Sequence, residues 1–304
     1  MKRTFVNSSF TDRLLLTACC ILILAGLSAQ NPVSAPPRDT ATNVRIEMLD
    51  GTVLLGKIKS RGEGVLSLTT LSGVEANVPV SQIREMTSID ITSIHKGEYW
   101  FENPNATRYL FGPSAFNLKK GEGYYQNTWL LLNSFNYGIT DYFSIGGGIE
   151  LISTFNGSPS FILTPKVGFK TGEKTALGGG LLLVNVGDFF DSNTLGIAYG
   201  VITRGTVNRN ITAGVGWGFV DGEFSARPII TFSGLTRVSK KVALLSENWI
   251  IPSDSYYPFF SYGVRFFGEK LAVDLAFVNN PDIASEIVIG IPYVDFVVKF
   301  GKRK

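Results

Sequence analysis

The sequence predicts an all-β protein: an antiparallel transmembrane β-barrel of about 12 strands, preceded by a small β module. Three observations predict this fold class. The chain holds 33 glycines, 22 phenylalanines and 11 tyrosines, and only 17% of its residues are charged, against roughly 25% in an average soluble domain. Turn signals recur about every thirty residues along the C-terminal part of the chain. The strands between them carry bulky apolar residues on one face and small residues on the other.

The first residues predict an export signal. The apolar stretch "LLLTACCILILAGL" follows a basic region formed by Lys2, Arg3 and Arg13, and "LSAQ" then offers a cleavage point near Ala29. A membrane-spanning helix needs ~20 apolar residues, which this stretch does not reach. We therefore expect residues 1–29 to be a signal peptide.

Loss of the signal peptide would change the composition of the mature chain. Three cations and one acid leave with it, so the formal charge falls from +3 to +1 and indicates little about partners. Both cysteines, Cys19 and Cys20, leave as well, so neither a disulfide nor a cysteine metal site is expected.

In the alternative, "LTAC" is a bacterial lipoprotein box and lipid is attached at Cys19. The polar stretch 30–42, "QNPVSAPPRDTAT", is expected to be a linker.

Residues 43–86 predict a separate β module. The turn signals "DG", "GEG" and "SG" separate alternating stretches and give about five short strands. A strand, "DG", a long bent strand, "GVLSLTT", "VP" and a final "IREM" resemble, in this order, a small Sm-like or SH3-like barrel. Sm-like folds often bind RNA, but this segment is slightly acidic and has no aromatic residue to stack a base. We therefore expect no nucleic acid and, instead, a periplasmic protein partner.

Residues 87–107 are expected to connect the module to the barrel. They contain His95, the only histidine of the chain. Tyr99, Trp100 and Phe101 suit either an aromatic belt at lipid headgroups or an apolar clip onto the next domain.

Residues 108–304 form the predicted barrel. Polar turns, each followed by a strand, begin near Thr140, Gly172, Asn208, Ser239 and Gly268. Their spacing matches one hairpin of an up-and-down barrel. The return strands, the stretches "TRYLFGPSAF" and "GYYQNTWLLLNSFNY", and a last strand ending at Phe300 bring the count to about 12.

The two faces of the strands indicate what surrounds the barrel. Ile211, Val215 and Trp217 lie on one side of their strand, with Thr212 and Gly214 on the other. A soluble barrel would fill its inside with bulky residues and place its charges outside. Bulky residues opposite small ones therefore predict lipid outside and a lumen inside. An even strand count puts both ends of the barrel, and the module before it, on the periplasmic side.

The stretch 97–129, together with "YGITDYFSIGGGIE" and "IAYGV", resembles uncharacterised outer-membrane barrel proteins of the Bacteroidota. The resemblance covers most of 97–300. It implies the fold and the cell outer membrane as location, with outer-membrane lipid as a partner, and implies no activity.

The sequence predicts that the protein is not an enzyme. Barrel enzymes of the outer membrane use histidine, and His95 lies before the predicted barrel. The glycine runs 146–148 and 178–180 do not precede a helix, so they are not phosphate cradles. We expect no catalytic residue, no metal and no cofactor.

Two function classes remain open. One is a narrow channel for small solutes, which glycine-lined strands favour. The other is a non-transporting structural or interaction protein whose barrel anchors the module of residues 43–86. The predicted loops are too short for a plug that folds into the lumen.

Six charged residues are expected to line the lumen as three pairs on neighbouring strands. The expected pairs are Glu150 with Lys166, Arg227 with Glu247, and Arg265 with Asp274. A charge that faces lipid costs ~2–4 kcal/mol near the midplane, whereas opposite charges across a strand pair stabilise by ~0.2–1 kcal/mol. These residues would set ion preference in an open pore, or would only satisfy one another in a filled barrel.

Overall fold

The computed structural model describes residues 43–89, 93–95, 98–157, 159–185, 194–253 and 256–301. The predicted signal peptide 1–29 and linker 30–42 lie outside the described residues. The chain divides into two compact units, Met1–Ile91 and Thr92–Lys304, which are described separately. Among the described residues, no helix has the length and apolar character needed to cross a membrane.

The first unit is an antiparallel sheet. Its elements are β1 (Asn43–Met48), β2 (Val53–Arg61), β3 (Val65–Thr70), β4 (Glu75–Pro79), the short helix η1 (Val80–Gln82) and β5 (Ile83–Ser88). The strand order is β4-β3-β2-β1-β5. Gly51, Gly64 and Gly73 adopt the left-handed conformation that the three turns require. Val44, Ile46, Leu66, Leu68 and Val78 form its core.

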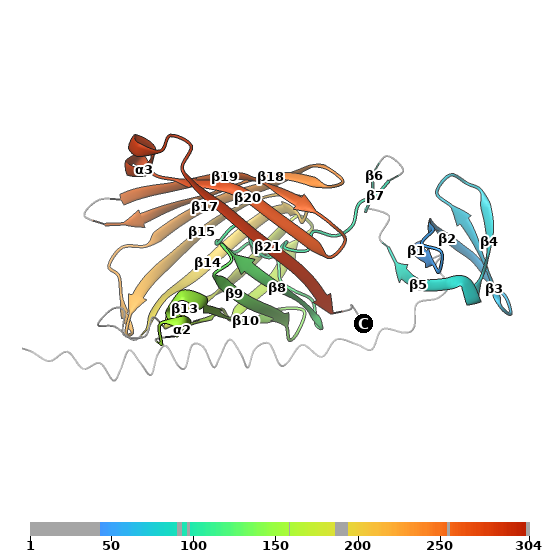
Figure 1. Cartoon of the computed structure of the whole chain (residues 1–304), viewed down its shortest axis with the longest axis horizontal. Helices are drawn as coiled ribbons and strands as arrows, with labels where there is room; N and C mark the ends of the chain where they lie inside the picture. The colour runs from blue at the N-terminus through green and yellow to red at the C-terminus, as the bar shows by residue number, and fades with distance from the viewer. Residues whose placement is uncertain are drawn as a thin grey trace, which may run out of the picture. The chain divides into compact units, whose positions relative to one another are not determined.

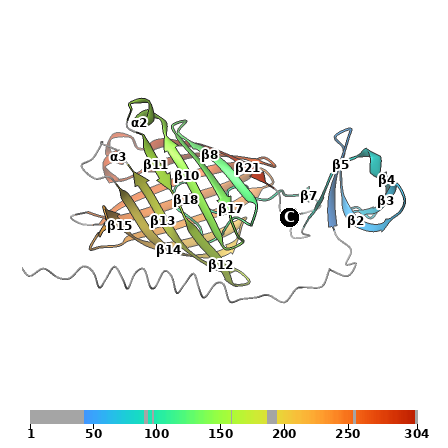
Figure 2. The same ribbon diagram turned by 90° about the horizontal axis from the view of Figure 1, so that it is seen from below.

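The second unit is a closed barrel. A two-stranded ribbon, β6 (Ile94–His95) with β7 (Glu98–Tyr99), precedes it. Its strands are β8 (Glu122–Thr128), β9 (Leu132–Gly138), β10 (Phe143–Glu150), β11 (Ser160–Leu163), β12 (Lys166–Gly172), β13 (Thr175–Asn185), β14 (Leu195–Thr206), β15 (Arg209–Val220), β16 (Glu223–Phe224), β17 (Ile229–Ser239), β18 (Val242–Pro252), β19 (Tyr256–Phe267), β20 (Leu271–Asn279) and β21 (Ile291–Gly301). β8 pairs with both β9 and β21, so the sheet closes on itself. Figure 2 shows the tilted strands of the β10–β14 wall.

Twelve strand positions complete the circle. β11 and β12 share one position because Pro165, which cannot donate a ladder hydrogen bond, separates them. The short β16 pairs only with β15 and adds no position. The predicted fold class is therefore confirmed.

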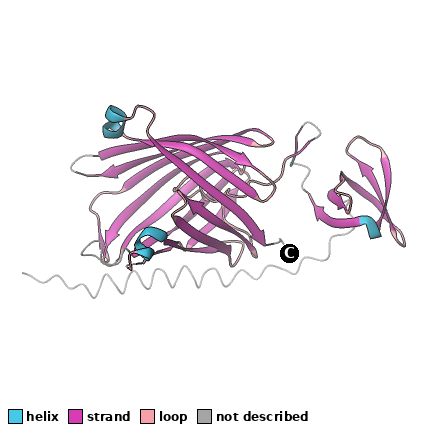
Figure 3. Ribbon diagram, viewed as in Figure 1, coloured by secondary structure: helices cyan, strands magenta, loops and turns pink. Residues whose placement is uncertain are grey.

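The two ends of the barrel differ. The five tight turns expected from the sequence, at 139–142, 173–174, 207–208, 240–241 and 268–270, lie at one end, together with the start of β8 and the end of β21. We call this the turn end. The opposite loop end carries the longer connections, including α2 (Leu151–Phe155) and α3 (Pro281–Glu286), and Figure 3 shows both helices away from the C-terminus.

The distribution of residues across the wall is that of a transmembrane β-barrel. Bulky side chains such as Ile211, Trp217 and Phe232 are exposed on the outside. Thr212, on the other face of β15, is buried inside. Apolar groups outside and polar groups inside match a barrel surrounded by lipid.

One expected wall strand instead lies inside the barrel. Residues 101–121, which we call the inner segment, run from β7 into the space enclosed by the strands (Figure 1, teal to green). The segment turns at its tip, where the Tyr109 N–H donates to the Gly112 carbonyl over 2.9 Å. The tip separates the two halves of "TRYLFGPSAF", which was expected to be one strand. Phe101 packs with Leu235 and Phe267 at the turn end, as the clip interpretation requires.

The expected count of about 12 strands is nevertheless correct, because a second error offsets this one. "GYYQNTWLLLNSFNY" was expected to be one strand, but Trp129 and Leu130 take positive φ angles of 52° and 64°. The chain reverses there and forms β8 and β9. The short loops were not expected to plug the lumen; the inner segment, which comes before the first wall strand β8, lies inside it instead.

Glycines on the inward face make room for the inner segment. A Cβ atom on Gly168 would lie 2.5 Å from the Ala115 carbonyl oxygen, and one on Gly178 would lie 3.1 Å from the Ala115 Cα. A Cβ on Gly138 would lie 2.2 Å from the Lys119 carbonyl oxygen. At these positions the glycine face of the wall therefore packs against the backbone of the inner segment.

We predict that Gly168→Val lowers the free energy of unfolding by about 1–3 kcal/mol, because the new side chain collides with the inner segment. Gly200→Val is the control: it is also a strand glycine, but its Cβ would meet nothing within 4 Å. The temperature at which the folded, faster-migrating band disappears on a gel measures the effect. Equal losses in the two variants would contradict the close packing.

Candidate functional site in the barrel lumen

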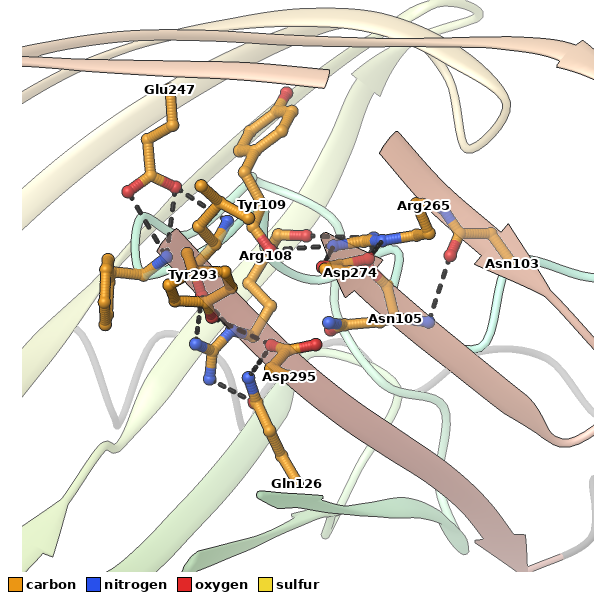
Figure 4. A network of polar contacts seen from close by, with 12 residues as sticks. Asn103, Asn105, Arg108, Tyr109, Gln126, Glu247, Arg265, Asp274, Tyr293 and Asp295 are labelled. Carbon is orange, nitrogen blue, oxygen red and sulfur yellow. Dashed lines mark hydrogen bonds and ion pairs between the residues drawn. The ribbon is translucent and has the colours of Figure 1, made fainter. Parts of the chain in front are cut away.

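Arg265 and Asp274 form the expected pair. They lie opposite each other on β19 and β20, and two hydrogen bonds of 2.6 and 2.7 Å join them. Both side chains are essentially inaccessible to solvent. Arg265 also donates to the carbonyls of Asn105 and Tyr109, each over 2.7 Å (Figure 4). The pair therefore holds the inner segment as well as the wall.

Glu247 does not pair with Arg227. The hairpin of β17 and β18 turns about residue 240 and not about 237, so Ser233 lies opposite Glu247. Arg227 lies exposed in the connection between β16 and β17. The pairing was wrong because the centre of the turn was misplaced by three residues.

The carboxylate of Glu247 instead binds the tip of the inner segment. It accepts hydrogen bonds from the backbone N–H groups of Leu110, Phe111 and Gly112, the shortest being 2.8 Å. A fourth donor is Nε1 of Trp249, 2.7 Å away. Hydrogen bonds to an ionised acceptor are stronger than neutral ones, so this carboxylate is a principal anchor of the tip.

Glu150 does not pair with Lys166 either. Their hairpin turns about Phe155, which places Ser160 opposite Glu150 and Ser144 opposite Lys166. Glu150 ends β10 at the loop end and caps α2. Its carboxylate accepts from the N–H groups that follow, at 2.8 and 2.7 Å. The helix shifts the centre of the hairpin, which sequence symmetry could not show.

Lys166 lies inside the lumen, with only 8% of its surface exposed. Its ammonium donates to the carbonyls of Thr107 and Phe116 at 2.9 and 2.6 Å. Thr107 precedes the tip and Phe116 follows it, so the two carbonyls belong to the two arms of the inner segment. No carboxylate among the described residues forms an ion pair with it. Lys166 therefore holds the two arms together by binding backbone oxygens.

The sequence analysis missed two charged residues of the interior, Asp295 and Arg108. Asp295 on β21 is fully buried and accepts from Tyr293 over 2.9 Å and from Gln126. Arg108, on the inner segment, donates to Gln126 and to the Leu110 carbonyl. The alternation of "YVDFV" places Asp295 inward and could have identified it. Around Arg108 the available signal is the turn dipeptide "GP" at Gly112 and Pro113, which interrupts the strand pattern.

Arg237 closes the turn end. Its guanidinium carbon lies 4.4 Å from the ring centroid of Phe267 and 5.1 Å from that of Trp100. It donates to the Phe101 carbonyl over 2.7 Å. Stacking on aromatic faces and hydrogen bonding together fix the point at which the inner segment enters.

Among the described residues, the side of the lumen along β12–β18 encloses unfilled space. A cavity of about 100 Å³ lies beside the inner segment and is lined by Arg108, Lys166 and Trp249, among others. A second cavity of about 900 Å³ shares Leu182, Ile197 and Ile229 with it. The larger cavity also borders the turn after β15, which places it toward the loop end. Among the described residues, no group of three or more metal-ligating side chains is arranged to hold a metal ion.

Comparisons with known proteins find similar barrels. A comparison with protein-family models and one with curated proteins find no match. Among solved structures, a KdgM porin matches with a TM-score of 0.42 and 10% identity over 60% of this chain and 99% of that chain. Outer-membrane expressed OmpT of Vibrio cholerae matches with a TM-score of 0.29 and 11% identity over 85% of this chain and 93% of that chain. At such identities a likeness concerns the fold alone.

We predict that Asp274→Asn lowers the free energy of unfolding by about 3–5 kcal/mol, because it leaves the buried charge of Arg265 without its partner. Arg227→Gln is the control and should change it by less than ~0.5 kcal/mol, because Arg227 is exposed in a loop. Denaturant unfolding in detergent micelles measures both values. A loss below ~1 kcal/mol for Asp274→Asn would show that the pair is not buried.

Proposed function

We propose that this protein is an outer-membrane β-barrel that acts as a narrow, gated channel for small solutes. The unfilled part of the lumen supports this proposal: the cavities of about 100 and 900 Å³ adjoin each other beside the inner segment. A barrel of this size can be filled by its own side chains. A non-transporting anchor for the module, the alternative function, would not require unfilled space.

The inner segment is the proposed gate. It occupies the turn-end half of the lumen, and side chains of the wall hold it by hydrogen bonds. Such contacts can be exchanged for contacts with water, unlike the continuous backbone ladder of the wall. Displacement of the tip from Glu247 would connect the cavities to the turn end.

We propose further that the turn end faces the periplasm, because both ends of the barrel chain lie there. The N-terminal module would then be periplasmic and, through residues 43–86, contact a protein partner rather than nucleic acid. Its strand order supports the proposed resemblance to Sm-like or SH3-like barrels.

We also propose that the chain is not an enzyme and that the Bacteroidota barrels are its relatives.

We predict that Glu247→Gln raises the open probability about tenfold or more in planar lipid bilayers. The amide keeps the shape of the carboxylate but loses charge-assisted hydrogen bonds worth ~1.5–3 kcal/mol each. Glu150→Gln is the matched control, because Glu150 caps a helix at the loop end. Together with Arg227→Gln it should leave conductance and ion selectivity unchanged.

The bilayer measurement separates the two function classes. Discrete channel openings that increase in Glu247→Gln support a gated channel. If neither the wild type nor Glu247→Gln conducts, although both fold, the channel is excluded and the anchoring function is left.

We predict that proteases added to intact cells spare the N-terminal module. After the outer membrane is opened, they should cut within 30–42 or 87–98, because the compact sheet between these stretches is protected by its core. Immunoblotting of the fragments measures this. Cutting in intact cells would place the module on the outer surface.

A further inference from the structure

The wall of the lumen becomes apolar toward the loop end. The inward-facing residues that line the larger cavity there include Leu182, Val184, Leu195, Ile197, Ile229 and Ile251. The register places Leu182 opposite Ile197 and Val184 opposite Leu195, so two apolar layers follow each other. The lumen of a water-filled porin is polar. This part of the lumen is therefore suited to an apolar group.

The base of this space carries a buried cation. Lys166 lies opposite Gly180, which is two residues below Leu182 on β13. An ammonium has three N–H donors, of which the carbonyls of Thr107 and Phe116 take two. No carboxylate among the described residues pairs with it, and Arg108, another cation, lines the same cavity. A buried ammonium without a counter-ion is energetically costly, and an anionic ligand would supply the counter-ion.

We propose that the loop-end half of the lumen binds a single-chain amphiphile with an anionic head group. The alkyl chain lies against the apolar wall, and the head group binds the ammonium of Lys166. This assignment rests on the proposed function, because it names the class of solute that the channel takes.

The sizes of the two cavities fit this ligand. An apolar cavity of ~150 Å³ holds a benzene ring. The inner cavity of about 100 Å³ is smaller, so it admits a head group and not a ring. The outer cavity of about 900 Å³ has room for the chain. From the layer of Gly180 to that of Val184 the wall rises by roughly 13 Å, at ~3.3 Å per residue.

Acidic residues at the mouth do not prevent binding of an anion at the base. Asp221 and Glu223 line the outer cavity and are exposed to solvent. Exposed charges are screened over roughly 10 Å at 0.1 M salt, which is less than the roughly 13 Å from the layer of Val184 to that of Gly180, opposite Lys166.

Binding of radiolabelled decanoate to the full-length protein in lipid nanodiscs tests the proposal, with empty nanodiscs to subtract partitioning into lipid. Unlabelled decanoate should displace the label. Decanol, which lacks the charge, and acetate, which lacks the chain, should be about tenfold weaker or worse. Decyltrimethylammonium, which carries the opposite charge, should not compete.

Two variants test the two parts of the site separately. Lys166→Met keeps an unbranched side chain but removes the charge, and should weaken decanoate binding about tenfold or more. Lys170→Met is its control, because Lys170 is exposed near the turn end of the same strand. Ile197→Trp fills the apolar space, leaves the charge of Lys166 in place and should abolish binding. Each variant is first tested for the folded band on a gel, and the competition series needs no variant.

Several results would overturn the proposal. Unchanged affinity in folded Lys166→Met would remove the head-group site. Acetate that competes as well as decanoate would show a site for small anions only. Decanoate binding without conductance in any variant would overturn the channel and leave the binding site, whereas conductance without decanoate binding would overturn the binding site alone.

Discussion

A segment that runs inside a barrel without joining its sheet must find partners for its backbone N–H and C=O groups among the side chains of the wall. This constraint accounts for the interior of the protein. Cations take the carbonyls: Arg265 those of Asn105 and Tyr109, and Lys166 those of Thr107 and Phe116. Acceptors take the amides, chiefly the carboxylate of Glu247 at the tip. Lys166, Glu247 and Arg265 thus all hydrogen-bond to the inner segment, whereas only Arg265 also pairs with another inward charge, Asp274.

The same constraint explains which parts of the site the sequence could predict. Alternation placed Lys166, Glu247, Arg265 and Asp274 on the inward face, and they are buried there. Only Arg265 and Asp274 also met as a pair, because their turn at 268–270 lies where the sequence placed it. The centre of the β10–β11 hairpin is shifted by α2, and the β17–β18 hairpin turns at 240–241 and not at 237. A shift of a few residues changes every partner.

The inner segment was not predictable from local pattern. A chain inside the lumen contacts a wall of mixed polarity, so its own mixture of Tyr109, Leu110 and Ala115 with polar residues resembles a wall strand. The turn signal "GP" at Gly112 and Pro113 interrupted that pattern and was the available warning. The closed barrel itself was predictable, because lipid outside and a polar interior impose one alternation on every strand.

The lumen thus has two halves with different chemistry, and Lys166 lies where they meet. Its ammonium holds both arms of the inner segment and also borders the cavity that opens toward the loop end. A ligand anion that binds the third N–H group neutralises the charge of this ammonium. The hydrogen bonds to the carbonyls of Thr107 and Phe116 then lose their charge-assisted strength, which weakens the hold on the inner segment. Binding of a ligand in the apolar, loop-end half and displacement of the inner segment from the polar, turn-end half are in this way linked through Lys166. A gate that responds to its own solute requires such a link.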